Sequence, residues 1–304
     1  MLKRTVLLFI AAIGFCLAAS PLAFAQDEPT PTSGEAEMTT AQTGYADVNG
    51  LHMYYEIHGA DTGTPLVVLH GAYMSIVTMG EFVPRLAETR QVIAVELQGH
   101  GRTADIPERP FSYEQLADDV AALMEEIGVE RADIFGYSLG GNTALQLAIR
   151  HPERVRKLVV ASAAYNTGAY HPGFFEMVET ITPELFAGTP IEAEYRQLAP
   201  NPDYFPRLVE KLVQLERDTE DWPAEDIHGI ESPTLIIIGD SDAVTPEHAV
   251  DMFRLRGGGV NGDLTGLPNA QLAVLPGTTH IGVMFRLDWL IPMITEFLDA
   301  PMPE

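Results

Sequence analysis

The sequence predicts an α/β fold in which helices cover both faces of a mostly parallel β-sheet. Short, uniformly apolar segments rich in β-branched residues recur along the chain, as strands that are buried on both faces require. Segments with helical periodicity separate most of them, and this alternation is typical of parallel sheets. The chain has 304 residues, of which 46% are apolar, so it is long enough for one large domain or two modest ones.

Local signals place the elements in order along the chain. Asn49-Gly50 is the strongest short hairpin signal, and it separates two expected strands, 45–48 and 51–57. Ser112 caps a periodic helix that ends at Gly128. Further strands are expected at 66–70, 91–97, 133–137, 157–161, 234–238 and 271–275. Further helices are expected after the 66–70 strand to about residue 88, at 139–150 and after residue 280.

The strand signal is absent between about residues 165 and 230, a segment rich in proline and aromatic residues. Because an insertion of this length between two strands is most simply a set of helices over one end of the sheet, we expect a helical lid there. We expect most of its aromatic side chains to form the core of the insertion and two or three to face a ligand. These residues are Tyr165, Tyr170, Phe174, Phe175, Phe186, Tyr195, Tyr204, Phe205 and Trp222.

The first 25 residues differ from the rest of the chain. A Lys-Arg pair at 3–4 precedes an almost wholly apolar run at 5–19, and the Ala-Phe-Ala at 23–25 matches the pattern before a signal peptidase site. The run is shorter than the roughly 20 residues that span a bilayer comfortably. We therefore predict a secretory signal peptide over 1–25 and a periplasmic or secreted protein, with an uncleaved anchor as the alternative. The only cysteine, Cys16, lies in this segment, so the mature chain would contain none.

Residues 26–43 are rich in Pro, Thr and Glu and are expected to form a flexible linker, followed by a single domain over 44–304. The formal net charge is −25, and it becomes −27 without the two basic residues of the signal peptide. So acidic a surface repels phosphate backbones and anionic headgroups. We therefore expect neither nucleic acid nor, after signal cleavage, a membrane as a partner.

The pentapeptide at 136–140, Gly-Tyr-Ser-Leu-Gly, fits the pattern G-x-S-x-G. It lies at the junction of an expected strand and an expected helix, where a nucleophile elbow forms. In such an elbow the serine, here Ser138, sits on a sharp turn with its hydroxyl exposed. Residues two before and two after it must pack closely, which explains Gly136 and Gly140. The helix N-terminus that follows favours an anionic intermediate.

A serine hydroxyl needs a base within hydrogen-bonding reach, and the base needs a carboxylate that orients it. His280 is the best-placed histidine, because it follows the last expected strand directly. Asp242 follows the strand before it, and Asp240 is the rival, which more naturally shapes the turn. His70 is expected to shape the loop that it begins. The remaining histidines are expected on the surface or in loops: His52, His58, His100, His151, His171, His228 and His248.

The order Ser138, Asp242, His280 is typical of this nucleophile elbow, and all three lie at carboxyl ends of expected strands. The anionic intermediate of acyl transfer also needs two N–H donors. The backbone N–H of Leu139 is one, and that of Ala72, in the loop after the 66–70 strand, is the candidate for the other. No metal-binding spacing occurs in the sequence, and we expect neither a metal nor a cofactor.

Five motifs in this order resemble the α/β-hydrolase superfamily, and in particular its serine carboxylesterases. They are HGAY at 70–73, ELQGHGRT at 96–103, GYSLGG at 136–141, GDSDAVTP at 239–246 and PGTTH at 276–280. The resemblance covers some 260 residues and implies the α/β-hydrolase fold with the same triad and the same two amides. Relatives usually have Asp, and Pro or Arg, where this chain has Glu96 and Gln98. We regard that loop as structural.

The function expected from these features is that of a secreted carboxylesterase acting on small to medium, largely apolar esters through an acyl-enzyme. Another Ser-triad hydrolase, such as a C–C bond hydrolase, lactonase or perhydrolase, is the alternative. A ligand-binding protein that keeps the fold without turnover is a third possibility, against which the intact triad argues. The sequence does not predict the substrate, the oligomeric state or the role of the glycine-rich insert at 257–269.

Overall fold

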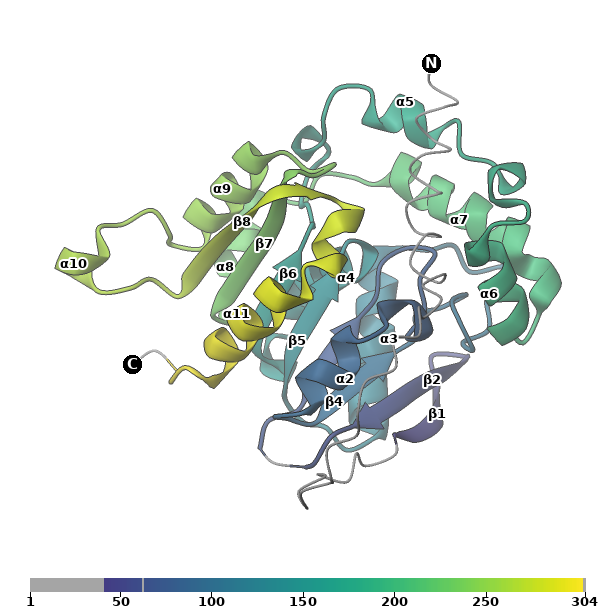
Figure 1. Ribbon diagram of the computed structural model, residues 1–304, viewed down its shortest axis with the longest axis horizontal. Helices are drawn as coiled ribbons and strands as arrows, with labels where there is room; N and C mark the ends of the chain where they lie inside the picture. Colours follow the sequence, from purple (N-terminus) through teal and green to yellow (C-terminus); the bar gives the residue numbers. More distant parts are fainter. Residues whose placement is uncertain (1–40, 62, 303–304) are drawn as a thin grey trace, which may run out of the picture.

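The computed structural model describes residues 41–61 and 63–302. The expected signal peptide and most of the expected linker lie outside these residues. The described residues form an eight-stranded sheet with the order β1-β2-β4-β3-β5-β6-β7-β8 (Figure 1). β2 pairs antiparallel with β1 and β4, and the pairs from β4 to β8 are parallel. The predicted α/β fold class, with its mostly parallel sheet, is therefore confirmed.

The strands are β1 (Gln42–Val48), β2 (Leu51–His58), β3 (Leu66–Leu69), β4 (Val92–Val95), β5 (Ala132–Tyr137), β6 (Val155–Ala161), β7 (Thr234–Ser241) and β8 (Ala270–Thr279). The α-helices are α2 (Phe82–Ala87), α3 (Tyr113–Glu126), α4 (Leu139–Arg150), α5 (Phe174–Val178), α6 (Pro190–Leu198), α7 (Phe205–Asp218), α8 (Ala224–Gly229), α9 (Pro246–Leu255), α10 (Gly262–Thr265) and α11 (Leu287–Asp299). The 3₁₀-helices are η2 (Val77–Met79), η3 (Pro152–Arg154), η4 (Thr167–Ala169), η5 (Pro183–Phe186), η6 (Pro202–Tyr204) and η7 (Ile281–Phe285).

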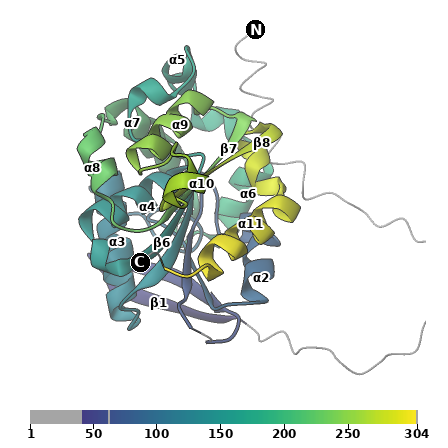
Figure 2. The same cartoon turned by 90° about the vertical axis from the view of Figure 1, so that its left-hand side faces the viewer.

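Helices cover both faces of the sheet and bury two apolar cores. α3, α4, α8 and α9 pack on one face, and α2 and α11 pack on the other (Figure 2). The central strands β3, β4 and β5 are buried along their whole length, which explains why their sequences are uniformly apolar rather than alternating. None of the helices in this described part is both long and apolar enough to cross a membrane.

The residues between β6 and β7 form the helices α5 to α8 and contain no sheet strand. We call α5, α6 and α7 with their connections the helical insertion; it lies at the end of the sheet where the parallel strands have their carboxyl ends (Figure 1). α7 contacts α5 and α6, and the buried side chains of α6 and α7 belong to the same core as α3 and α4. Of the nine aromatic residues expected to supply most of a core for the insertion, three are buried there, Phe186, Tyr195 and Phe205, and Tyr165, Tyr170 and Trp222 are partly buried against the same core.

Some boundaries differ from the expected ones. β1 starts at Gln42, two residues before the expected start of the domain, because its main chain pairs with β2 whatever the side chains are. The long helix expected after the third strand is instead a loop over 70–76, then η2 and the short α2. β7 and β8 extend to Ser241 and Thr279, because their main chains continue to pair past the apolar residues.

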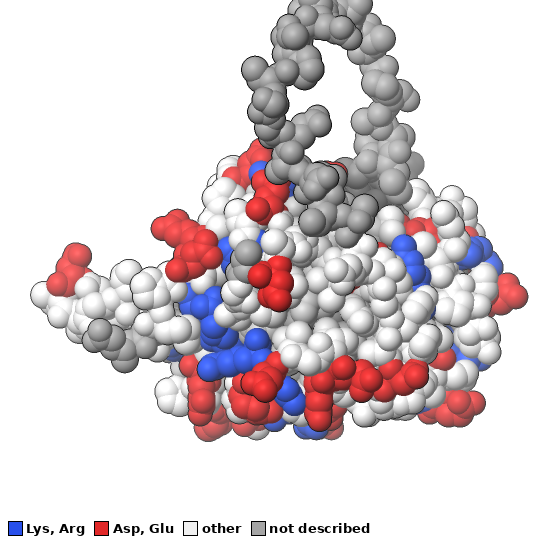
Figure 3. Space-filling model, turned by 90° about the horizontal axis from the view of Figure 1, so that it is seen from below, with Lys and Arg blue, Asp and Glu red and all other residues white. Residues whose placement is uncertain are grey.

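The insert at 257–269 forms an arm with α10 near its end, and the arm extends away from the sheet (Figures 1 and 3). Leu264 and Leu267 on the arm are 81% and 87% exposed. Figure 3 also shows acidic side chains spread over the face seen from below, with basic ones between them, in keeping with the net charge of −25.

Candidate active site

Ser138 occupies the sharp turn between β5 and α4. Its φ of 52° and ψ of −116° are unfavourable for a residue with a side chain, and such strain is typical of functional positions. A Cβ on Gly136 would lie 2.1 Å from the carbonyl oxygen of Gly140, and a Cβ on Gly140 would lie 2.4 Å from that of Leu69. Only glycine fits at both positions, and this close packing lets the turn expose the serine hydroxyl.

The structure brings Ser138, His280 and Asp242 together, although 142 and 38 positions separate His280 from the other two. Nε2 of His280 lies 2.9 Å from Oγ of Ser138. Nδ1 of His280 lies 2.6 Å from Oδ1 of Asp242. His280 comes directly after β8 and Asp242 directly after β7, so two neighbouring strand ends hold the imidazole and the carboxylate. This geometry suits a nucleophile, a base and an orienting acid.

The carboxylate of Asp242 is buried but well supplied with donors. Ser162 donates to Oδ2 at 2.6 Å, and the N–H groups of Gly239 and Val244 donate at 3.3 Å each. Burial alone would raise the pKa of Asp242. The charge of His280 and the hydrogen bonds from His280, Ser162 and Val244 outweigh burial and hold that pKa below its usual value. The residue therefore remains an anion beside the imidazole.

Asp240, the rival carboxylate, binds the backbone of β8, whereas His280 binds Asp242. Asp240 accepts hydrogen bonds from the backbone N–H of Gly277 at 2.8 Å and of Thr278 at 3.1 Å, and these bonds lower its pKa. Asp240 therefore ties the end of β7 to the end of β8, which is a structural role, as expected.

Ala72, in the loop after β3, lines the same cavity as Ser138. Ala72 N–H donates no hydrogen bond to the described residues, and Leu139 N–H, at the first position of α4, has no partner within its helix. Tyr73, the next residue in the loop, has a φ of 62°. Its N–H donates to Nε2 of His100 at 3.3 Å. Both amides therefore remain available to a developing oxyanion.

His70 shapes this loop as expected, since its Nδ1 lies 2.8 Å from the carbonyl oxygen of Gly71 and its Nε2 accepts from Leu97 N–H at 3.2 Å. The expectation for His248 was wrong: it lies in α9 and is buried, and its ring accepts a hydrogen bond from Tyr165 N–H. His100 lies in a loop, as expected, and is also buried, with its ring accepting from Tyr73 N–H. Burial lowers the pKa of His70 to about 4 and that of His100 to about 3, so both rings are neutral acceptors.

The buried carboxyl of Glu96 also stabilises the loop after β3. Its side chain is fully buried, and it binds Arg102 at 2.8 Å and accepts from Ile76 N–H at 3.4 Å. Burial raises the pKa of Glu96 to about 7, although Arg102 and the backbone donors oppose this shift. The position is structural, as we expected of this loop.

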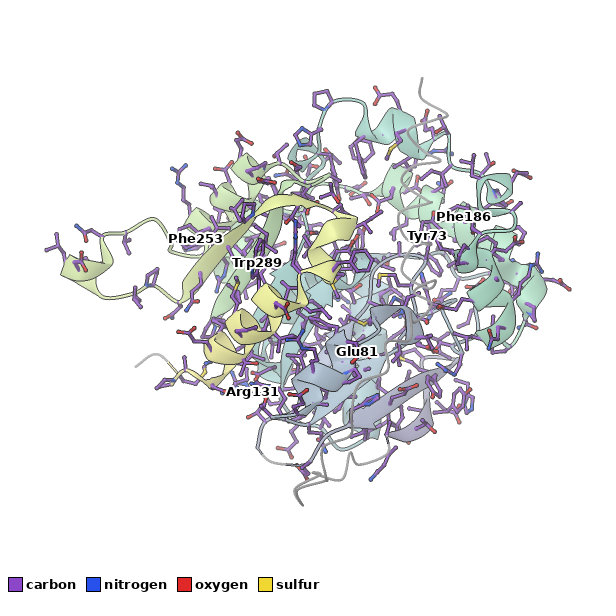
Figure 4. All side chains as sticks on the ribbon, in the orientation of Figure 1. Tyr73, Glu81, Arg131, Phe186, Phe253 and Trp289 are labelled. Carbon is purple, nitrogen blue, oxygen red and sulfur yellow. The ribbon has the colours of Figure 1, made fainter. Side chains whose placement is uncertain are left out.

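A cavity of about 420 Å³ opens above Ser138, between the strand ends and the helical insertion. Its walls are mostly apolar or aromatic. They include Tyr170 and Phe174, two of the nine aromatic residues expected in the insertion. Tyr73 at its edge packs against Phe186 of the insertion, with ring centroids 4.8 Å apart (Figure 4).

The charged groups of this cavity are all acidic. No Lys or Arg of the described residues lines it, whereas Glu81, Glu194 and Glu216 do. Ser75 donates to Glu194 at 2.6 Å. Within the same described residues, no three His, Cys, Asp or Glu side chains form a group that could hold a metal ion.

Sequence reasoning missed Ser162 and Glu216. Ser162 directly follows β6, so its place at a carboxyl strand end was a usable signal. Glu216 lies four residues after the buried Leu212 on α7, and this spacing puts it on the inward side of the helix.

Residues 64–287 match a family model described as the alpha/beta hydrolase fold. The chain belongs to this family. The alpha/beta hydrolase is 27% identical over 210 residues to 2-hydroxymuconate semialdehyde hydrolase of Pseudomonas sp. (strain CF600), with 62% of this chain and 74% of that protein covered. It is 31% identical over 262 residues to a pimeloyl-(acyl-carrier protein) methyl ester esterase of Neisseria meningitidis, with 79% and 95% covered. The enol-lactonase of Burkholderia xenovorans has the same fold, with a TM-score of 0.63 at 23% identity over 84% of this chain and 100% of that one.

Proposed function

We propose that this alpha/beta hydrolase is an exported carboxylesterase that hydrolyses small to medium, largely apolar esters with Ser138 as nucleophile. The observation that carries the proposal is the continuous hydrogen-bonded chain from Ser138 through His280 to Asp242, which opens into an apolar cavity of about 420 Å³. Cavities of roughly 300–1,000 Å³ are typical of small-molecule sites.

In this proposal, His280 removes the proton of Ser138 as the oxygen attacks the ester carbonyl. Asp242 fixes the imidazole tautomer and stabilises the imidazolium. The N–H groups of Ala72 and Leu139 bind the oxyanion of the tetrahedral intermediate. His280 then returns the proton to the departing alcohol. A water molecule, deprotonated by His280, attacks the acyl-enzyme and releases the acid and free Ser138.

The relatives support two reactions, cleavage of an ester and of a C–C bond. One is by name a methyl ester esterase, and another is by name a hydrolase of 2-hydroxymuconate semialdehyde, which is a carboxylate. The cavity favours the ester. Its lining holds three glutamates and, among the described residues, no lysine or arginine that would bind a substrate carboxylate. A C–C bond hydrolase is the second candidate function because of the relative named 2-hydroxymuconate semialdehyde hydrolase. A lactone is a cyclic ester, so lactone hydrolysis belongs to the first candidate function.

Paired substrates test the reaction type on the protein that lacks residues 1–25. We expect hydrolysis of p-nitrophenyl butyrate and no turnover of a β-diketone of similar size. Turnover of the diketone but not of the ester would contradict the proposed esterase function and would support a C–C bond hydrolase instead.

A fluorophosphonate probe tests the nucleophile without any assumption about substrate. We expect the wild type to be labelled and Ser138→Ala to lose both labelling and turnover. Ser232→Ala is the matched control, since Ser232 lies before β7 and its hydroxyl binds the carbonyl oxygen of Val155. An unlabelled wild type would mean that the protein binds ligands without turnover.

The export part of the proposal rests on the sequence of residues 1–25. Expression of the full chain in a bacterium, followed by fractionation and N-terminal sequencing, tests it. We expect a periplasmic or secreted product that begins at Gln26. A product with an intact N-terminus in the membrane fraction would indicate an anchor instead.

A further inference from the structure

Glu216, on α7, carries an unusual carboxyl group in the wall of the cavity. One oxygen, Oε1, accepts a hydrogen bond of 3.1 Å from the hydroxyl of Tyr113. The other, Oε2, is shielded from solvent and has no hydrogen-bond partner among the described residues. By contrast, the neighbouring carboxyl of Glu194 is bound by Ser75. Glu216 is therefore the glutamate of this cavity that has a buried oxygen without a hydrogen-bond partner among the described residues.

An acceptor buried without a partner is costly, typically by about 1–3 kcal/mol and more when it is charged. Burial accordingly raises the pKa of Glu216 above its usual value, despite the hydrogen bond from Tyr113 and the charge of His280. No Lys or Arg lines the cavity among the described residues, so these residues supply no permanent cation to Glu216 there. A bound ligand with a positively charged N–H group would give Oε2 a hydrogen-bond donor and would offset the cost of burying the carboxylate charge.

The aromatic walls favour the same kind of ligand. Tyr113, Tyr170 and Phe174 line the cavity together with Glu216, and the rings of Tyr170 and Phe174 stack with centroids 4.1 Å apart. The faces of aromatic rings attract ammonium groups. Rotation about the last side-chain bond of a glutamate is soft, so Oε2 can turn toward a donor in the cavity.

We propose that Glu216 is a specificity-determining residue that binds a protonated amine on the ester substrate. This inference rests on the proposed esterase function and narrows it from apolar esters in general to apolar esters that carry a basic amine. In the complex, the carboxylate of Glu216 accepts an N–H of the ammonium group as well as the hydroxyl of Tyr113, and the neighbouring rings surround the methyl or methylene groups on the nitrogen.

Two pairs of esters that differ only by a protonated nitrogen in place of a CH group test this proposal. With the amine in the alcohol part, the pair is 2-(dimethylamino)ethyl butanoate and isopentyl butanoate. With the amine in the acyl part, it is ethyl 4-(dimethylamino)butanoate and ethyl 5-methylhexanoate. Each pair is extended by homologues with longer linkers, and acid release at neutral pH gives kcat/KM. We expect the amine ester to be preferred at least about tenfold in one of the two series.

Glu216→Gln keeps the shape of the side chain and its contact with Tyr113 but removes the charge. We expect it to lower kcat/KM for the preferred amine ester at least about 30-fold, as for loss of one partner from a buried charged pair. For the neutral ester of the same pair, a change below about threefold is expected. Glu210→Gln is the matched control, because Glu210 is an exposed residue of the same helix, and it should behave as the wild type.

The outcomes separate this inference from the function on which it rests. If neutral esters are hydrolysed, no amine ester is preferred and Glu216→Gln affects both members of a pair equally, the inference is wrong and the esterase function stands. A readout without turnover is protection of Ser138 from the fluorophosphonate probe. Protonated isopentylamine should protect the wild type at lower concentration than isopentyl alcohol, and Glu216→Gln should abolish this difference. Equal protection by both compounds would also overturn the inference.

Discussion

Ser162 donates a hydrogen bond of 2.6 Å to Oδ2 of Asp242, the carboxylate oxygen that does not face His280. The backbone of Ser162 has a φ of 55°, which is unfavourable for a residue with a side chain. Strain of this kind persists only where the surrounding structure enforces it. The turn after β6 therefore holds the Ser162 hydroxyl under the acid of the triad, and we assign Ser162 as a positioning residue.

Removal of the Ser162 hydroxyl should slow the chemistry without weakening substrate binding. A hydrogen bond to a charged group contributes about 1.5–3 kcal/mol, and part of this acts on the orientation of Asp242. We expect Ser162→Ala to lower kcat for p-nitrophenyl butyrate about tenfold with KM nearly unchanged. Steady-state kinetics beside the wild type measure this effect. An unchanged kcat, or a loss confined to KM, would show that Ser162 does not act through Asp242.

Asp240, near the end of β7, and Asp242, directly after it, should differ sharply in their effect on turnover. Asp242→Asn leaves a neutral amide beside Nδ1 of His280, which disfavours the reactive tautomer, and comparable changes in a serine protease cost about 10⁴ in kcat. Asp240→Asn removes a carboxylate that contacts only the turn and its neighbours Gly277 and Thr278. We expect its kcat to stay within about threefold of the wild type. A reversed order of the two variants would assign the acid to Asp240.

Much of the fold and of the site could be predicted because the signals are local. The uniformly apolar strands report a sheet buried on both faces, and the glycines around Ser138 report a close approach of two backbones. His280 and Asp242 were identifiable because each follows a strand directly, and the carboxyl ends of parallel strands meet at one edge of the sheet.

The features that sequence reasoning missed depend on contacts between distant residues. Ser162 lies 80 positions from Asp242, and Glu216 lies 103 positions from Tyr113, so neither pairing leaves a local pattern. His100, in a loop, and His248, in α9, are buried by packing that only the folded chain provides. A loop forms where a helix was expected after β3, and three of its backbone groups bind the side chains of His70, His100 and Glu96.

The glycine at the start of the elbow should be intolerant even of alanine. A Cβ on Gly136 would lie 2.1 Å from the carbonyl oxygen of Gly140, and neither backbone can shift without moving the turn. We expect Gly136→Ala to lower the free energy of unfolding by about 3 kcal/mol in urea titrations and to abolish activity. The control is Gly229→Ala, because a Cβ at Gly229 has no neighbour within 4 Å and its φ is not positive. That variant should unfold within about 1 kcal/mol of the wild type, and equal losses in both variants would refute the close-packing argument.

The buried carboxyl of Glu96 should make stability depend on pH in a direction opposite to that of an ordinary salt-bridged acid. Because burial raises its pKa from 4.5 to about 7, the folded protein keeps a proton that the unfolded chain releases. The contribution of Glu96 to stability is therefore complete below about pH 4.5 and is lost as the pH rises through about 7, a change of about 3 kcal/mol.

Glu96→Gln cannot titrate, so the free energy of unfolding of the wild type should fall relative to this variant between about pH 5 and 8. Urea titrations across that range measure the difference, with the exposed Glu88→Gln as control for loss of one charge. Parallel pH curves for wild type and Glu96→Gln would mean that Arg102 holds Glu96 ionised throughout.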